Sequence, residues 1–135
     1  MTPQTRIDQL RRRVQDDPAS IAFAQLAEEC RRGGQFQEAV EVCRTGLATH
    51  PEYLSARVTL GRALLALGAL EEARVELDMV LQAAPDNLAA RRAVGEACRR
   101  LGLEEDALAH LSSALRLAPK DQDRKSTRLN SSHRT

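Results

Sequence analysis

The most reactive side chains in this 135-residue chain are three cysteines, Cys30, Cys43 and Cys98. A zinc site holds its cysteine and histidine ligands at short, characteristic spacings, and none of these cysteines has such a neighbour. The first residues, MTPQTRIDQLRRRV, also lack the apolar segment of a secretory signal. Since an odd number of cysteines in a chain that is not exported indicates reduced thiols, we expect a cytoplasmic protein with three structural cysteines and no disulfide.

The three histidines form no catalytic set either. His50 precedes a proline, His110 lies within a helical pattern, and His133 falls near the end of the sequence. None has a cysteine or a carboxylate at ligand spacing, and the chain shows no serine–histidine–acid set and no glycine-rich phosphate loop. The sequence therefore predicts that the protein is not an enzyme and holds no cofactor or metal.

The elements that carry these residues repeat every 34 residues. With repeat starts at Ser20, Leu54 and Leu88, five columns are identical in all three copies. These columns are Ala22/Ala56/Ala90, Gly34/Gly68/Gly102, Ala39/Ala73/Ala107, Leu47/Leu81/Leu115 and Pro51/Pro85/Pro119. Self-similarity at a fixed period of this length indicates an architecture of stacked repeats, because each unit must bury its apolar face against the next.

Each repeat contains two helical patterns separated at a glycine. We expect the first helices at 20–32, 54–67 and 88–101, and the second helices at 36–49, 70–83 and 104–117. The glycine column suits a helix end that needs a positive φ, and the proline column ends the second helix. A further amphipathic helix, 3–16, has Ile7, Leu10 and Val14 on one face. The predicted fold is all-α: an α-solenoid of three stacked helix-turn-helix repeats with an N-terminal capping helix.

Small residues recur where the two helices of a repeat must approach closely. They are Ala27, Gly61 and Gly95 in the first helices and Ala39, Ala73 and Ala107 in the second. Larger apolar side chains should fill the layer between hairpins: Leu26, Leu60, Val94, Cys43, Leu77, Leu111 and the Leu47/Leu81/Leu115 column. With no Trp, two Phe and one Tyr in the whole chain, this core has to be mainly aliphatic.

These columns resemble the tetratricopeptide repeat family, whose 34-residue unit has small residues at positions 8 and 20 and proline at position 32. The resemblance covers residues 20–119 and holds in three copies. The sequence departs from the family at position 4, where an aromatic residue is expected. Phe23 fills this position in the first repeat, but Arg57 and Arg91 fill it in the others, which suggests a looser core.

The resemblance implies a scaffold that holds a peptide or partner segment in a concave groove lined by the first helix of each repeat. The partner-binding residues that it implies are Glu28, Arg31, Arg32, Val58, Arg62, Leu65, Arg92, Glu96, Arg99 and Arg100. Arginine binds carboxylates bidentately, so we expect a protein or peptide partner with an acidic or C-terminal segment. The alternative is that these arginines are simply solvated helix faces.

Two other function classes stay open. RNA-binding pentatricopeptide proteins are also stacked helical hairpins, but their 35-residue period and the proline column here favour protein binding, and we expect no nucleic-acid partner. The chain is alternatively the docking arm of a larger enzyme whose sequence continues beyond it. No segment approaches about 18 consecutive apolar residues, so we expect no membrane partner. The sequence does not predict an oligomeric state.

The last residues form a region of their own. Residues 123–133, DRKSTRLNSSH, resemble a translated short-read sequencing adapter. They distort the charge, because the net charge of +1 for the whole chain hides a slightly acidic segment 1–122. We expect a capping helix in 1–18, repeats in 19–119 (20–53, 54–87 and 88–121), and a disordered, largely artefactual tail in 120–135 of a longer, bacterial-looking chain.

Overall fold

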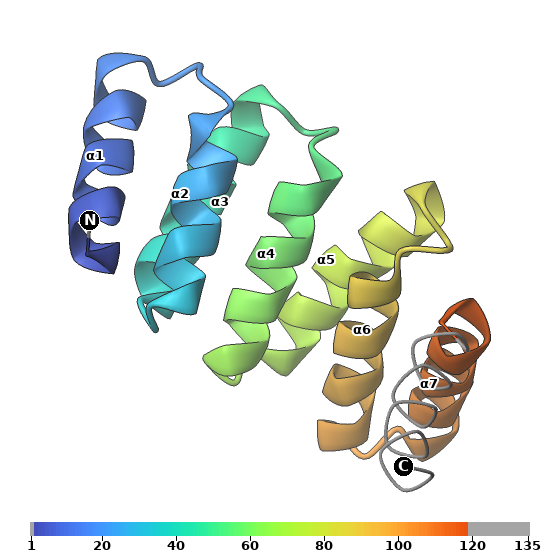
Figure 1. Ribbon diagram of the computed structural model, residues 1–135. Helices are drawn as coiled ribbons and strands as arrows, with labels where there is room; N and C mark the ends of the chain where they lie inside the picture. Colours follow the sequence, from blue (N-terminus) through green and yellow to red (C-terminus); the bar gives the residue numbers. More distant parts are fainter. Residues whose placement is uncertain (1, 119–135) are drawn as a thin grey trace, which may run out of the picture.

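The computed structural model describes residues 2–118, and these residues form seven α-helices. In chain order the helices are α1 (Pro3–Asp16), α2 (Ala22–Arg32), α3 (Phe36–Thr49), α4 (Leu54–Ala66), α5 (Leu70–Ala83), α6 (Leu88–Arg100) and α7 (Glu104–Leu117). Helix α1 stands at one end, and the other helices form three hairpins stacked side by side (Figure 1). The predicted all-α solenoid is confirmed. The tail expected at 120–135 and the adapter-like residues 123–133 lie outside the described residues.

The stack curves because its two layers are packed differently. In the first layer, α2 contacts α4 and α4 contacts α6, whereas α3, α5 and α7 in the second layer do not contact one another within residues 2–118. Figure 1 shows α2, α4 and α6 in front of α3, α5 and α7. The closer layer must lie on the inside of the curve, so α2, α4 and α6 line the concave side.

A left-handed glycine ends the first helix of every hairpin. Gly34, Gly68 and Gly102 have φ values of 80°, 82° and 81°. The amide that follows each glycine donates back to the helix: Gln35 to the Cys30 carbonyl at 2.8 Å, Ala69 to Leu64 at 2.9 Å and Leu103 to Cys98 at 2.9 Å. This Schellman arrangement satisfies helix-end carbonyls and needs a residue that tolerates positive φ. It confirms the turn predicted at the glycine column.

Glycines inside the helices set how closely the paired helices pack. A Cβ added to Gly61 would lie 2.5 Å from Cγ of Leu77, and one added to Gly95 would lie 2.9 Å from Cγ of Leu111. Gly46 is a third such position, which the repeat columns do not reveal, and a Cβ there would overlap the ring of Phe23. Phe23 is the only aromatic residue at position 4, so the first hairpin needs the extra space.

The core runs through all three hairpins but ends before the outer face of α7. Leu26, Leu60 and Leu77 are buried, as predicted. The Leu47/Leu81/Leu115 column was predicted to be buried in all three repeats, and this prediction is wrong for Leu115, whose exposed fraction is 56%. Leu47 and Leu81 are covered by the hairpin that follows them, whereas within the described residues no further helix follows α7.

The arginines at position 4 make specific contacts inside their hairpins. Arg57 pairs with Glu76 of α5 at 2.7 Å and donates to the Pro51 carbonyl at 2.9 Å. Arg91 donates to the Pro85 carbonyl at 2.8 Å and faces Nδ1 of His110 at 3.2 Å. The expectation of a looser core overlooked these contacts, which tie the first helix to the second helix and to the preceding loop.

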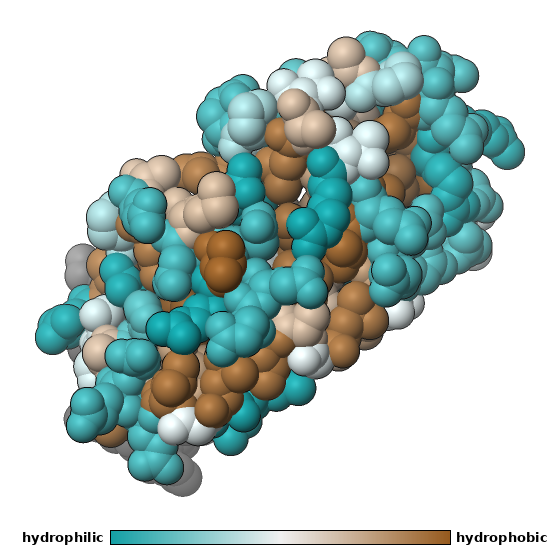
Figure 2. Space-filling view, turned by 180° about the vertical axis from the view of Figure 1, so that it is seen from behind, coloured by the Kyte–Doolittle hydropathy of each residue, from teal (hydrophilic) through white to brown (hydrophobic). Residues whose placement is uncertain are grey.

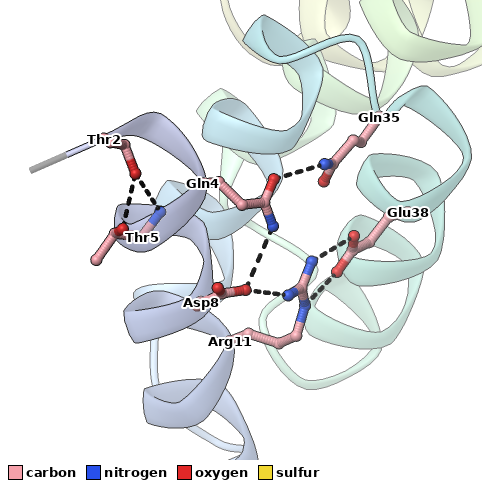
Figure 3. A network of polar contacts seen from close by, with 7 residues as sticks. All are labelled: Thr2, Gln4, Thr5, Asp8, Arg11, Gln35 and Glu38. Carbon is pink, nitrogen blue, oxygen red and sulfur yellow. Dashed lines mark hydrogen bonds and ion pairs between the residues drawn. The ribbon is translucent and has the colours of Figure 1, made fainter.

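The capping helix α1 is attached by apolar and polar contacts. Ile7 and Leu10 are buried, and α1 packs against α2 as predicted. Arg11 makes two hydrogen bonds of 2.8 Å with the Glu38 carboxylate on α3 and pairs with Asp8 at 2.7 Å (Figure 3). Bidentate pairing of this kind is geometrically specific, so it fixes the position of α1 along the first hairpin.

Candidate partner-binding groove

The concave side of the stack contains two adjoining hollows between α2, α4 and α6. The first has a volume of about 450 Å³ and includes Glu28, Val58 and Arg62 in its lining. The second has a volume of about 580 Å³ and includes Arg31, Arg62 and Leu65. Arg62 and Ala89 line both hollows, so the two form one groove along the inner layer.

Most of the ten residues implied by the family resemblance lie around this groove. Those that line a hollow are Glu28, Arg31, Val58, Arg62, Leu65, Arg92 and Arg100. Three others, Arg32, Glu96 and Arg99, line neither hollow. The contacts of each charged residue then determine which arginines are available to a partner.

Glu28 forms ion pairs with two arginines at one side of the groove. Its carboxylate accepts hydrogen bonds from Arg31 at 2.8 and 2.7 Å and from Arg32 at 3.2 Å. The hydroxyl of Thr59 donates to it at 3.2 Å. The hydrogen bond from Arg31 lowers the pKa of Glu28 to about 2 against the opposing effect of burial, and the charge of Arg31, the Thr59 hydroxyl and the charge of Arg62 add to the shift. Arg31 is therefore engaged inside the protein, although its side chain lines the second hollow.

A similar pair occupies the last turn of α6. Arg99 donates to Glu96 at 2.9 and 2.6 Å, and this hydrogen bond lowers the pKa of Glu96. Its neighbour Arg100 instead donates to the carbonyl of Leu65 on α4 at 3.1 Å. A carbonyl satisfies one donor of a guanidinium but leaves its charge uncompensated, so Arg100 remains a positive charge beside the second hollow.

Arg62 and Arg92 are the two groove arginines with neither an ion pair nor a hydrogen bond to any residue of the segment 2–118. Both are exposed, and both line the second hollow, on α4 and α6 respectively. No carboxylate lines that hollow. The two glutamates implied by the resemblance thus form ion pairs with Arg31, Arg32 and Arg99, whereas Arg62, Arg92 and Arg100 form no ion pair within residues 2–118.

The floor of the groove is apolar and includes aromatic residues that the sequence analysis did not assign to the site. Val58, which lines the first hollow, is buried, and Leu65, which lines the second, is half-buried. Phe36 lines the second hollow and Tyr53 the first. Phe36 is the first residue of α3, and Tyr53 lies directly before α4. Both were missed because the resemblance implied groove residues only from within the first helix of each repeat.

The cysteines are structural, as predicted. All three are free and buried. Burial raises the pKa of Cys30 to about 11 and that of Cys43 to about 12, so both thiols are protonated at neutral pH and are poor nucleophiles. Within the described part of the chain, no group of three or more histidine, cysteine, aspartate or glutamate side chains is arranged to hold a metal ion.

The face seen from behind in Figure 2 is mainly hydrophilic. Figure 2, seen from behind relative to Figure 1, shows hydrophilic side chains over most of the face, with apolar side chains in separate patches. None of the seven helices is both long and apolar enough to cross a lipid bilayer.

The family of this chain follows from two sequence matches. Two models described as tetratricopeptide repeat match residues 32–97 and 76–122, which together make up more than half of the chain. The chain belongs to the tetratricopeptide repeat family. Members of this family are typically protein-interaction scaffolds and are generally not catalytic. No curated protein matches the chain.

Among solved structures, the chain is similar to several proteins named MamA. A MamA from Desulfovibrio magneticus RS-1 is 23% identical with a TM-score of 0.80, over 87% of this chain and 67% of that one. A MamA labelled MSR-1 is 24% identical with a TM-score of 0.77, over 88% and 69% of the two chains. The chain thus spans about two thirds of their length, and identities this low show a shared fold alone.

Proposed function

We propose that this chain is a non-catalytic protein-interaction scaffold whose groove binds an extended, acidic segment of a partner protein. The observation that carries the proposal is the separation of paired from uncompensated arginines. Arg62 and Arg92 lack an ion pair within residues 2–118 and line the same hollow, above the apolar side chain of Leu65. A segment with carboxylates on one side and an apolar side chain on the other complements this surface.

Guanidinium groups that already bind a carboxylate gain little from a second one, whereas an unpaired guanidinium can form a new charge-assisted hydrogen bond. Such bonds contribute about 1.5–3 kcal/mol each, more than a neutral hydrogen bond. The half-buried apolar floor adds the burial of the partner's side chain, at roughly 25 cal/mol per Å². Together these contributions favour an acidic segment over a neutral one of the same shape.

A titration with a synthetic peptide tests the proposal. The probe is a fluorescein-labelled ten-residue peptide of Glu and Ala with a central Leu, and its control has Gln in place of each Glu. We expect the acidic peptide to raise the fluorescence anisotropy and the Gln peptide to bind more weakly. Replacing Arg62 and Arg92 together with Gln should weaken binding by about 100-fold, since each lost bond accounts for about a factor of 10.

A second double variant controls for the change in net charge. Arg12→Gln with Arg13→Gln removes the same charge from α1, where both residues are exposed, and should change the affinity by less than about 3-fold because distant surface charges are screened. Equal weakening by both double variants would contradict a specific groove. Tighter, steeply salt-dependent binding of labelled poly(U) RNA than of the acidic peptide would favour the RNA-binding alternative. The expected cytoplasmic location stays a prediction.

A further inference from the structure

The two hollows of the groove follow one another along α4. Ser55 and Thr59, in the first half of this helix, line the first hollow, and Leu65, in its last turn, lines the second. Arg62 lies between them and lines both hollows. An extended segment that lies along the groove therefore meets the two linings in succession, and a difference between the linings is read as an order of residues.

The charged residues are divided unequally between the two linings. Among the described residues, the first hollow is lined by one carboxylate, Glu28, and one guanidinium, Arg62. The second is lined by no described carboxylate and by four arginines, Arg31, Arg62, Arg92 and Arg100. Arg31 is paired with Glu28, whereas the other three arginines of the second lining form no ion pair within residues 2–118. The second hollow is therefore the more positive of the two.

Glu28 keeps a negative charge in the first hollow. Its pKa is about 2, so its side chain is ionised at neutral pH. The arginines that pair with it lie outside this hollow, because Arg31 lines the second hollow and Arg32 lines neither. A carboxylate of the partner in the first hollow would lie beside a like charge, and like charges at close range disfavour each other. An uncharged side chain avoids this cost.

The other polar side chains of the first hollow are suited to uncharged groups. Asn87 accepts the Ala90 amide hydrogen through its side-chain oxygen at 2.9 Å, and its NH2 group donates to no acceptor within residues 2–118. The side chains of Gln25, Tyr53 and Ser55 line the same hollow and also form no hydrogen bond within that segment. Amide and hydroxyl groups donate to and accept from peptide groups and uncharged polar side chains.

We propose that the groove selects its partner segment by residue order, with an uncharged, hydrogen-bonding half in the first hollow and an acidic half in the second. This inference rests on the proposed binding of an acidic segment and adds that the acidic residues are clustered in one half. Glu28 is the specificity-determining residue, because it disfavours carboxylates in the first hollow. Specificity of this kind needs a repulsive contact against the wrong ligand as well as attractive contacts to the right one.

Anisotropy titrations of the full chain with three fluorescein-labelled peptides of one composition test the order. The peptides are QQQQLEEEE, its reverse EEEELQQQQ and the alternating EQEQLQEQE. We expect one clustered peptide to bind about 10-fold more tightly than the alternating one, because alternation moves carboxylates from the arginines to Glu28. Preference for either clustered peptide supports the proposal, since both chain directions fit it. Equal affinities of all three would overturn this inference alone, whereas no binding of any peptide would overturn the proposed function as well.

Glu28→Gln tests the residue that sets the order. The preference for the clustered peptide over the alternating one should fall to less than about 3-fold, because the first hollow then lacks its negative charge. Glu96→Gln is the matched control: it removes the same charge and also releases an arginine, Arg99, but Glu96 lines neither hollow, so the preference should not fall. The ratio of two affinities within one variant cancels the change in net charge, and circular dichroism confirms that the helices are intact. An unchanged preference in Glu28→Gln, or an equal fall in both variants, would overturn the inference.

Discussion

Gly46 shows that a single methyl group can decide the packing of the first hairpin. By helix propensity alone, Gly46→Ala should stabilise α3 by about 1 kcal/mol. The added Cβ would overlap the ring of Phe23, which is buried. We therefore expect Gly46→Ala to lower the free energy of unfolding by about 1–3 kcal/mol, measured by urea denaturation.

Two further variants isolate the contact between Gly46 and Phe23. Phe23→Leu together with Gly46→Ala should recover much of the stability lost in Gly46→Ala, because the ring is then absent. Ala48→Gly, at an exposed site of the same helix, should show only the propensity loss of about 1 kcal/mol. Stabilisation by Gly46→Ala would show that the two helices are farther apart than described here.

His110 makes the stability of the third hairpin depend on pH. Burial, and then the charge of Arg91, lowers the pKa of His110 below its ordinary value, while Asp78 and Asp106 oppose the shift. The folded protein thus binds the proton less well than the unfolded chain. The stabilisation is present above the unfolded pKa of about 6.5 and is lost as the pH falls through the lower folded value. We expect the free energy of unfolding to decrease from about pH 7 to pH 5.

Substitutions at position 110 distinguish His110 from the other titrating groups. His110→Gln should flatten the pH dependence in this window without raising stability at neutral pH. His110→Glu places a carboxylate opposite Arg91, as Glu76 lies opposite Arg57 in the second hairpin. The new ion pair should stabilise the protein by about 1 kcal/mol at pH 7. Urea denaturation at several pH values measures both effects, and an unchanged pH slope in His110→Gln would contradict the role given to this residue.

At the scale of the elements, the second hairpin depends on the fit between Leu77 of α5 and Gly61 of α4. Leu77 is fully buried, so Leu77→Ala should cost about 2–5 kcal/mol in the free energy of unfolding. Gly61→Ala should also destabilise, because its Cβ would meet Leu77. In the double variant the new Cβ occupies part of the vacated space, so the combined loss should be smaller than the sum of the single losses.

Leu115→Ala provides the control for this measurement. It removes the same atoms from an exposed site, so it should change stability by at most about 0.5 kcal/mol. Strict additivity of Gly61→Ala and Leu77→Ala, or a large loss in Leu115→Ala, would contradict the stacking of hairpins described here.

The elements were largely predictable from sequence because their signals are local and repeated. The glycine column marks a required positive φ, and the proline column marks a helix end, so each helix boundary was predicted to within two residues. Burial of Leu115 was not predictable from its column, because it depends on whether another hairpin follows. The periodic pattern specifies which face of a helix is apolar and does not specify what covers it.

The side-chain pairing in the groove was much less predictable. The family resemblance implied that the first helices line the groove but could not separate the arginine engaged by Glu28 from the unpaired Arg62. That distinction depends on rotamers and on spacing along and between neighbouring helices. The polar contacts of Arg57 were missed for the same reason. An arginine in place of the expected aromatic residue indicates a loss of apolar packing, and only the structure shows that it pairs with Glu76.

At the scale of the whole molecule, the concave surface differs in character from the exposed end of the stack. The concave layer of α2, α4 and α6 concentrates the uncompensated arginines over an apolar floor. The end of the stack exposes Leu108 and Leu115 on α7. A substitution at the exposed end of α7 should therefore leave the groove intact: Leu115→Glu should not change the affinity for the acidic peptide.

The central claim is that the concave layer is the binding surface, and a two-dimensional ¹H–¹⁵N NMR titration with the acidic peptide tests it most directly. We predict that the shifted amide signals belong to α2, α4 and α6, are largest around Arg62 and Arg92, and disappear in the double Gln variant of these two arginines. Shifts confined to α3, α5 and α7, or shifts of equal size with the Gln-containing control peptide, would contradict the account.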